Sequence, residues 1–464
     1  MATEAPDRMS SLDAFFFYTE EDGRNHMHVG GFALVEGLAP TAEEVAASLG
    51  ERLRPLPRYR QLARPFRLHV NRPVWVPAPD FDVRQHVQAT TADSPDRAGL
   101  RRALEQFIST PLDHSRPLWE VLVVDGINDG PAGWAIAWKI HHSMVDGVSG
   151  TELLTILFDG APQASTADPL PLPSGSASSA AGAVTDLVRD ALHQVGSVRP
   201  ATIGKAVRVA RSGLAITRRT IVPDVRSPLV GRIGKDRAFD WCSVPFEDVQ
   251  RIRATLGGTV NDVVLTAVLD GFRALLLGRG LNVKGKGLRL MAPVALRSRD
   301  ASGTPLGDGT MSTKASALMP RLPLDVEDPV QRLKEVAGQL ERLKATSQAE
   351  AVTAINEVAA VLPGTVTAVL MRAMSAVPQR SLHTTVTNVH GPTVPLSLLG
   401  RRLLTIGNYA PPFPVGARSS VTVYSYGGNL VFGVTTDRDS LPDVDVLVNG
   451  IRSGLSELLS RAED

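Results

Sequence analysis

Residues 140–147 of the chain read IHHSMVDG, which places two adjacent histidines before an aspartate and a glycine at the end of an apolar run. An imidazole that is neutral near pH 7 can remove the proton from a hydroxyl group as that group attacks a thioester carbonyl. One imidazole is enough for this task, so the adjacent histidine and the carboxylate of Asp146 would hold the reacting ring and its turn. Gly147 would permit a close backbone approach or a positive φ. The stretch therefore predicts a general-base site for acyl transfer.

The neighbouring segments predict a hairpin that presents this site. Residues 120–126 and 133–140 have the apolar character of strands, and they flank the turn-rich residues 127–131. The second strand would deliver His141 and His142 to its end, and residues 148–157 would continue as a helix.

Other readings of the same residues stay open. A serine nucleophile has no Gly-x-Ser-x-Gly elbow around Ser143 or Ser149, and Cys242 lacks a catalytic signature. A metal site is a second reading, because His26 and His28 could face one way on a strand, although the chain contains no His-Glu-x-x-His pattern. A histidine at a strand end can also be purely structural.

Length and composition predict a globular protein of two domains. A chain of 464 residues exceeds the size at which a single core stops growing. A net charge of +1 argues against nucleic acid as a general partner. The single cysteine and an N-terminus without a secretory pattern predict a cytoplasmic location, and no apolar stretch is long enough to span a bilayer.

A change in composition divides the chain into three predicted segments. Residues 1–160 form an N-terminal half that carries the histidine pair, and residues 238–464 form a C-terminal half. The crossover, 161–237, begins with a stretch rich in Pro, Ser, Gly and Ala. It continues into a basic part, 199–237, with ten basic and two acidic residues, a charge of about +8. This basic part would be either a solvated face or a surface that docks on anionic lipid.

The motif resembles the His-His-x-x-x-Asp-Gly pattern of the coenzyme-A-dependent acyltransferase superfamily, which includes chloramphenicol acetyltransferases and peptide-synthetase condensation domains. Further stretches are similar, in order from about residue 9 to 460, to the bacterial wax ester synthase/diacylglycerol acyltransferase family. These stretches are MSSLDAFF (9–16), MHVG (27–30), DFDVRQHV (80–87), PLWE (117–120), ND (261–262), PVALR (293–297) and NVHGP (388–392). The chain departs from the family pattern at Ala295, where serine is common, and at Val389 and His390.

The resemblance implies an α+β fold of two chloramphenicol-acetyltransferase-like domains with an active-site tunnel at their interface. It implies that His142 is the general base and that His141 supports it. It also implies that Asp146 is structural and pairs with an arginine of the other half, for which Arg297 is the candidate. Asn261 would donate a hydrogen bond to the developing oxyanion or would only cap its helix. Pro117, Leu118 and Trp119 would shape the tunnel wall or belong to the plain core.

The resemblance further implies an O-acyltransferase that moves a long-chain acyl group from acyl-CoA to diacylglycerol or to a fatty alcohol, without a covalent acyl-enzyme. Acyl-CoA would be a co-substrate, and no cofactor or metal is expected. The enzyme would associate peripherally with the inner membrane surface or with lipid inclusions. The alternatives are an acyltransferase of the same fold with another acceptor, such as a glycolipid hydroxyl, and a non-catalytic lipid-binding or lipid-inclusion protein.

Overall fold

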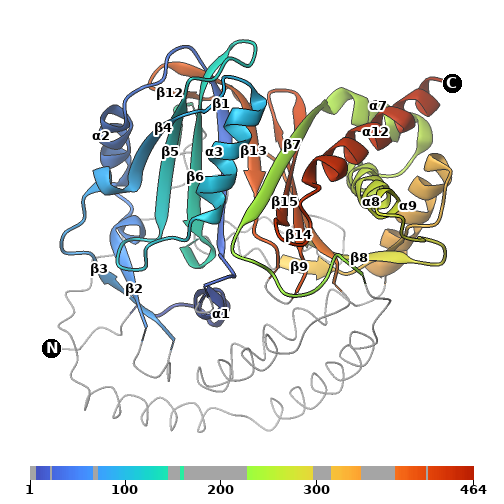
Figure 1. The fold of residues 1–464 in the computed structure, drawn as a ribbon, viewed down its shortest axis with the longest axis horizontal. Helices are drawn as coiled ribbons and strands as arrows, with labels where there is room; N and C mark the ends of the chain where they lie inside the picture. Colours follow the sequence, from blue (N-terminus) through green and yellow to red (C-terminus); the bar gives the residue numbers. More distant parts are fainter. Residues whose placement is uncertain are drawn as a thin grey trace, which may run out of the picture.

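Two mixed β-sheets, each covered by helices, make up the two halves of the protein (Figure 1). The structure is a computed structural model, and it describes residues 7–20, 23–65, 72–144, 157–160, 227–295, 315–345, 382–413 and 416–464. The predicted α+β architecture of two halves is confirmed. None of the helices in these ranges combines the length and the apolar character needed to cross a membrane.

The first sheet has the strand order β12-β13-β1-β6-β5-β4. Its strands are β1 (His28–Glu36), β4 (Val87–Thr91), β5 (Trp119–Asp125), β6 (Ala132–His141), β12 (Ser397–Leu398) and β13 (Arg401–Tyr409). Strands β5 and β6 form the predicted antiparallel hairpin, and β6 ends at the histidine pair. Gly30 lets β1 approach β6, because a Cβ at this position would lie 1.9 Å from the Trp138 carbonyl oxygen.

Helices cover the two faces of this sheet. They are α2 (Ala42–Leu53), which begins with a capping box, and α3 (Arg97–Ser109), whereas α1 (Ser11–Thr19) lies beyond the end of the sheet (Figure 1). Val121 and Val123 of β5 share a core cluster with the apolar face of α2, whereas Leu122 and Val124 share one with α3. This alternation follows from the two-residue period of a strand. A small sheet, β2 (Gln61–Arg64) with β3 (Val74–Pro77), and the 3-10 turns η2 (Pro57–Arg60) and η4 (Val83–His86) complete this half.

The second sheet has the order β10-β8-β11-β14-β15-β7, with β9 paired to β8. Its strands are β7 (Arg237–Pro245), β8 (Gly287–Ala295), β9 (Ala315–Leu318), β10 (Arg321–Pro323), β11 (Thr384–Val389), β14 (Ser419–Tyr426) and β15 (Asn429–Asp437). The helices are α7 (Phe246–Leu256), α8 (Val260–Gly278), α9 (Pro329–Ala345) and α12 (Val444–Glu463). Strands β14 and β15 form a hairpin that turns at Gly427 and Gly428, both of which have positive φ. The apolar helix α8, with Thr259 as its N-cap, lies in the core between α9 and α12.

The C-terminal half supplies two strands to the sheet of the N-terminal half. Strand β13 pairs antiparallel with β1, with Gly30 opposite Tyr409 and Leu34 opposite Thr405, and β12 extends the sheet beyond it. Figure 1 shows β13 beside β1, between the two halves. The predicted segment 238–464 is therefore not a spatially separate unit, because residues 397–409 belong to the first sheet.

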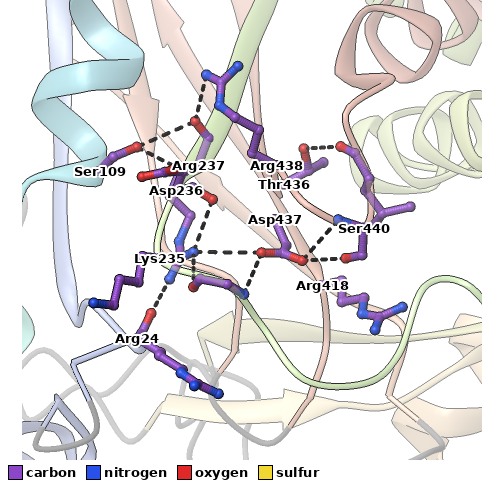
Figure 2. Close-up of polar contacts among 12 residues, drawn as sticks. Arg24, Ser109, Lys235, Asp236, Arg237, Arg418, Thr436, Asp437, Arg438 and Ser440 are labelled. Atoms are coloured by element: carbon purple, nitrogen blue, oxygen red, sulfur yellow. Dashed lines mark hydrogen bonds and ion pairs between the residues drawn. The ribbon is translucent and has the colours of Figure 1, made fainter.

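The start of β7 ties the halves together through polar contacts. The Arg237 guanidinium donates to the carbonyl oxygens of Gly234, at 2.9 Å, and of Arg24, and its Nη1 lies 4.0 Å from Asp437 Oδ1. The backbone N–H of Arg237 donates to Ser109 Oγ at the end of α3, at 2.8 Å. Figure 2 shows Arg237 between Asp437 on one side and the backbone of Arg24 on the other. The hydrogen bonds of Arg237 to Arg24 and Ser109 thus cross the seam between the halves, while its ion pair with Asp437 lies within the second sheet.

This position corrects one expectation for the basic part of the crossover, 199–237. Arg237 was counted among the residues of a solvated or lipid-docking face, but its side chain is only 2% exposed and its charge faces Asp437. Arg232 and Lys235 are exposed. The other basic residues of this part lie outside the described residues.

Candidate active site

The histidine pair is held by backbone hydrogen bonds to both neighbouring strands. His141 is the last residue of β6 and lies opposite His28 of β1. Its N–H donates to the Leu118 carbonyl oxygen at 2.9 Å, and the N–H of His142 donates to the Met27 carbonyl oxygen at 2.8 Å. His142 then begins the 3-10 turn η5 (His142–Met144). The register of the sheet therefore fixes the backbone positions from which the two imidazole rings project.

His141 is fully buried and has a defined tautomer. Its Nδ1 accepts from the backbone N–H of Ser143 at 3.1 Å and lies 2.6 Å from Ser143 Oγ. Because Nδ1 accepts, the proton of the neutral ring lies on Nε2, which faces Glu20 Oε2 at 3.6 Å. Burial lowers the pKa of His141 to about 4, so the ring is neutral at pH 7. His141 has the environment of a supporting residue.

His142 is more open than its neighbour. The residue is half-buried, and its ring packs against Phe16 of α1, with 4.0 Å between the ring centroids and 34° between the planes. Of the two histidines, His142 is therefore the one that is partly exposed to solvent.

Glu20 is a residue of this site that the sequence did not reveal. It ends α1, and its carboxylate accepts hydrogen bonds from the Met27 N–H and from His114 Nε2, the latter at 2.8 Å. Burial opposes ionisation of this side chain. The hydrogen bond from His114 and the charge of a protonated His141 outweigh it, and they lower the pKa of Glu20 to about 2. Glu20 is thus an anion at neutral pH, next to the histidine pair.

A pocket of about 600 Å³ lies at the seam between the halves. Its walls come from the end of α3, the segment before β1, the start of β7 and the end of β15, and they include His26, Glu105, Ser109, Lys235, Asp236 and Arg438. The ring of His26 stacks on that of His28, with 5.8 Å between centroids, and His28 is the strand partner of His141. One wall of the pocket is thereby connected to the histidine pair.

Comparison with known proteins identifies the family. The model of the wax ester synthase/diacylglycerol acyltransferase catalytic domain matches residues 9–264, and the model of the C-terminal domain of these enzymes matches residues 312–459. The chain belongs to the wax ester synthase/diacylglycerol acyltransferase family. A relative in Mycobacterium tuberculosis named "Probable diacyglycerol O-acyltransferase tgs1" is 33% identical over 98% of this chain and 96% of its own.

Solved structures show the same fold in this family and beyond it. The wax ester synthase/diacylglycerol acyltransferase from Marinobacter aquaeolei VT8 matches with a TM-score of 0.69 and 22% identity, covering 99% of this chain and 100% of that one. The first condensation domain of the calcium-dependent antibiotic synthetase matches with a TM-score of 0.56 and 12% identity, covering 100% and 97%. The predicted family, fold and enzyme class, an acyl-CoA-dependent O-acyltransferase, are confirmed.

Several residues of the predicted family site are not in the described part of the chain. Asp146, Gly147 and Arg297 lie outside the described residues, so the proposed pairing of Asp146 with Arg297 stays a prediction.

Asn261 lies in the first turn of α8, in the C-terminal half, and is half-buried. The cap of this helix is a capping box made by Thr259 and Asp262, whose side chains and backbone N–H groups bond reciprocally. The helix is therefore capped without Asn261. Its role as an oxyanion donor stays a prediction.

The predicted tunnel residues Pro117, Leu118 and Trp119 are buried in the core of the N-terminal half. The indole of Trp119 donates to the Tyr59 carbonyl oxygen at 2.9 Å and stacks on the His86 ring. The Leu118 carbonyl oxygen accepts the N–H of His141, so this segment supports the histidine pair from β5. Its contact with a substrate stays a prediction.

The structure also bears on the two alternatives to a general base, which are a metal site and a serine or cysteine nucleophile. His26 and His28 donate from Nε2 to the carbonyl oxygens of Lys235 and Ile108, at 3.1 and 2.9 Å, and the described residues contain no cluster of three or more metal-ligating side chains. Cys242 is buried, and burial raises the pKa of its thiol to about 12, so it is a poor nucleophile. Ser143 is 5% exposed, with its hydroxyl directed at His141.

Proposed function

We propose that this enzyme transfers a long-chain acyl group from acyl-CoA to the hydroxyl of diacylglycerol or of a fatty alcohol, with His142 as the general base. The observation that supports this role is the contrast within the pair. His141 is fully buried and hydrogen-bonded through Nδ1 to Ser143, whereas His142 is half-buried at the end of a strand that the sheet holds in register. Family membership supports the acyl transfer itself.

The proposed reaction is a single displacement at the thioester carbonyl. The acceptor oxygen attacks the carbonyl carbon while His142 takes the hydroxyl proton. The tetrahedral intermediate then expels the CoA sulfur, which receives that proton from the imidazolium, so the products are an ester and free CoA. No acyl-enzyme forms, and no cofactor or metal takes part. We propose that the Asn261 amide donates to the oxyanion.

We further propose that Asp146 and Arg297 pair to fix the loop that follows His142, without relaying a proton. A double-mutant cycle tests this pairing. The free energies of unfolding of D146A, R297A and the double variant should show coupling, and independent effects would reject it.

Because the proposed acceptors are lipids, we propose that the reaction takes place at a membrane or inclusion surface. We propose that the basic part of the crossover docks on anionic lipid. At the C-terminal end of this part, Arg232 and Lys235 are exposed and can contribute, whereas the buried Arg237 cannot. Each basic residue near an anionic surface contributes about 1 kcal/mol. Co-sedimentation with anionic and neutral vesicles at two salt concentrations tests this. Binding that is equal on both lipids would reject electrostatic docking.

The decisive experiment compares purified wild type, His142→Ala and the control His390→Ala, whose residue is exposed in the second half. Each protein receives radiolabelled long-chain acyl-CoA with either diacylglycerol or a fatty alcohol, and the lipid products are resolved. We expect H142A to lose about 100- to 10,000-fold in rate with the acceptor that wild type uses, and H390A to match wild type. Undiminished transfer by H142A would show that the base is another group.

A further inference from the structure

Helix α1 contacts both members of the histidine pair. Phe16 packs on the ring of His142, and one turn later the Glu20 carboxylate faces Nε2 of His141 at 3.6 Å. We infer that Glu20 is a positioning residue for the general base, acting through His141 and through the backbone of Met27. This inference rests on the proposed function of His142.

The first path runs through the tautomer of His141. Ser143 occupies Nδ1 with its backbone N–H and directs its hydroxyl to the same atom, which leaves the ring proton on Nε2. Nε2 points at the carboxylate of Glu20, so an anion there favours this tautomer and this ring orientation. The ring of His141 is thus fixed from both ends, and with it the turn that carries His142.

The second path runs through the backbone. Glu20 Oε1 accepts the N–H of Met27, and the carbonyl oxygen of the same Met27 accepts the N–H of His142 at 2.8 Å. Glu20 Oε2 also binds His114, in the segment that follows α3. One carboxylate therefore joins the segment before β1, the segment after α3 and the end of β6.

The location of Glu20 is not explained by the stability of its own helix. A negative charge at the C-terminus of a helix faces the negative end of the helix dipole, which is unfavourable. The side chain is nevertheless only 6% exposed, and burying an anion costs free energy unless it is paired. The partners supply the explanation, because the described ionisable side chains that interact with Glu20 are nitrogen bases, namely His26, His28, His114, His141 and Lys139.

The charge has a second consequence for catalysis. The Glu20 carboxylate lies 3.6 Å from the ring of His141, the residue next to His142, and it is ionised while His141 is neutral at pH 7, so this anion favours the positive charge that His142 gains when it takes the substrate proton. This stabilisation arises in the transition state, so its loss lowers kcat more than it raises KM. It also makes the acidic limb of the pH profile of kcat/KM depend on Glu20.

The test uses three variants of the full chain. Glu20→Gln keeps the shape and an acceptor oxygen for Met27 but removes the charge, and Glu20→Asp keeps the charge on a shorter arm. The control is Asp240→Asn, which also removes a buried carboxylate. Asp240 pairs with Arg97 at 2.7 Å, with 11% of its side chain exposed. Thermal melts establish that each variant is folded.

We expect E20Q to lose about 10- to 100-fold in kcat with a KM for acyl-CoA within about twofold of wild type. Its acidic limb should move to lower pH. E20D should retain the wild-type limb and part of the rate, and D240N should behave as wild type. The inference would be overturned if folded E20Q had the kcat and the acidic limb of the wild type. It would also be overturned if the acidic limb moved equally in E20Q and E20D.

Two further results separate the possible failures. If E20Q does not fold, Ser143→Ala replaces it, since this variant loosens His141 without a change of charge. S143A is expected to lower kcat with an unmoved limb, and wild-type kcat in S143A would reject the positioning role. An active H142A would refute the proposed function itself, whereas an inactive H142A beside an unaffected E20Q would refute only the role of Glu20.

Discussion

The guanidinium of Arg237 and the carboxylate of Asp437 lie 4.0 Å apart, with only 2% and 1% of their side chains exposed, and they face each other across paired strands β7 and β15. Removal of one partner leaves the other charge buried without compensation. We therefore expect Asp437→Asn to lower the free energy of unfolding by about 3 kcal/mol, measured by urea denaturation.

An exposed ion pair provides the control for this prediction. Arg402 and Glu36 likewise pair across two neighbouring strands, β13 and β1, at 3.3 Å, but their side chains are 65% and 51% exposed. Glu36→Gln should cost less than about 1 kcal/mol. Equal losses in the two variants would mean that burial of the Arg237 pair contributes nothing.

Acid should weaken the fold through His141. Burial lowers the pKa of this residue from 6.5 to about 4, so below pH 6.5 the unfolded chain binds a proton that the folded chain does not. The free energy of unfolding should therefore fall between pH 6.5 and 4 and lose this dependence below pH 4. In His141→Asn the slope of the free energy of unfolding against pH in this range should be smaller by up to about 1.4 kcal/mol per pH unit. Urea denaturation at several pH values measures this slope.

His390 offers the matched control for that titration, because it is exposed. His390→Asn should keep the wild-type slope. A slope in H141N equal to that of wild type would contradict the assignment of the acid sensitivity to His141.

Phe16 should matter for the rate, because its ring packs on His142 with 4.0 Å between centroids. Phe16→Leu removes the flat contact while leaving an apolar side chain, and a small displacement of a catalytic ring is costly in rate. We expect kcat to fall about 10-fold. Phe15→Leu is the control, since Phe15 contacts the Phe16 ring at 5.5 Å and is one position removed on the same helix. Equal rates in F16L and F15L would contradict a role of this contact.

Thr259 and Asn261 should separate stability from activity. Thr259 caps α8, so Thr259→Ala should lower the free energy of unfolding by about 1 kcal/mol, with kcat unchanged. Asn261→Ala should change stability by less than about 0.5 kcal/mol. If its amide binds the oxyanion, N261A should lose about 100-fold in kcat. Urea denaturation and steady-state rates measure both effects, and a rate equal to wild type would refute the oxyanion role.

Much of the fold follows from local patterns in the sequence. The alternating apolar residues of β5 and β6 and the turn between them predict a hairpin, and that hairpin carries the histidine pair to a strand end. The start of α8 at Thr259 follows from a polar cap before an apolar run. These features depend on neighbours within a few residues, which a single sequence displays directly.

Other features depend on contacts between distant residues, and the sequence contains no local sign of them. Glu20 reads as an ordinary polar residue after a helix, because its partners His114 and His141 are 94 and 121 positions away. Arg237 ends a run of basic residues, and only the folded chain shows that it is buried opposite Asp437. The strand pattern of residues 401–409 gives no indication that β13 joins the first sheet.

The exchange of β13 limits how members of this family can be recombined. A chimaera joined within the crossover would bring its own residues 397–409 into a sheet whose β1 comes from a different parent. The paired residues of β1 and β13 would then come from two parents whose sequences evolved separately. One such pair is Phe32 and Gly407, where the Phe32 ring lies close to the glycine. Functional hybrids should therefore be obtained when this strand is transplanted together with the N-terminal parent, and modularity in this fold follows hydrogen-bonded sheets more closely than it follows the linear chain.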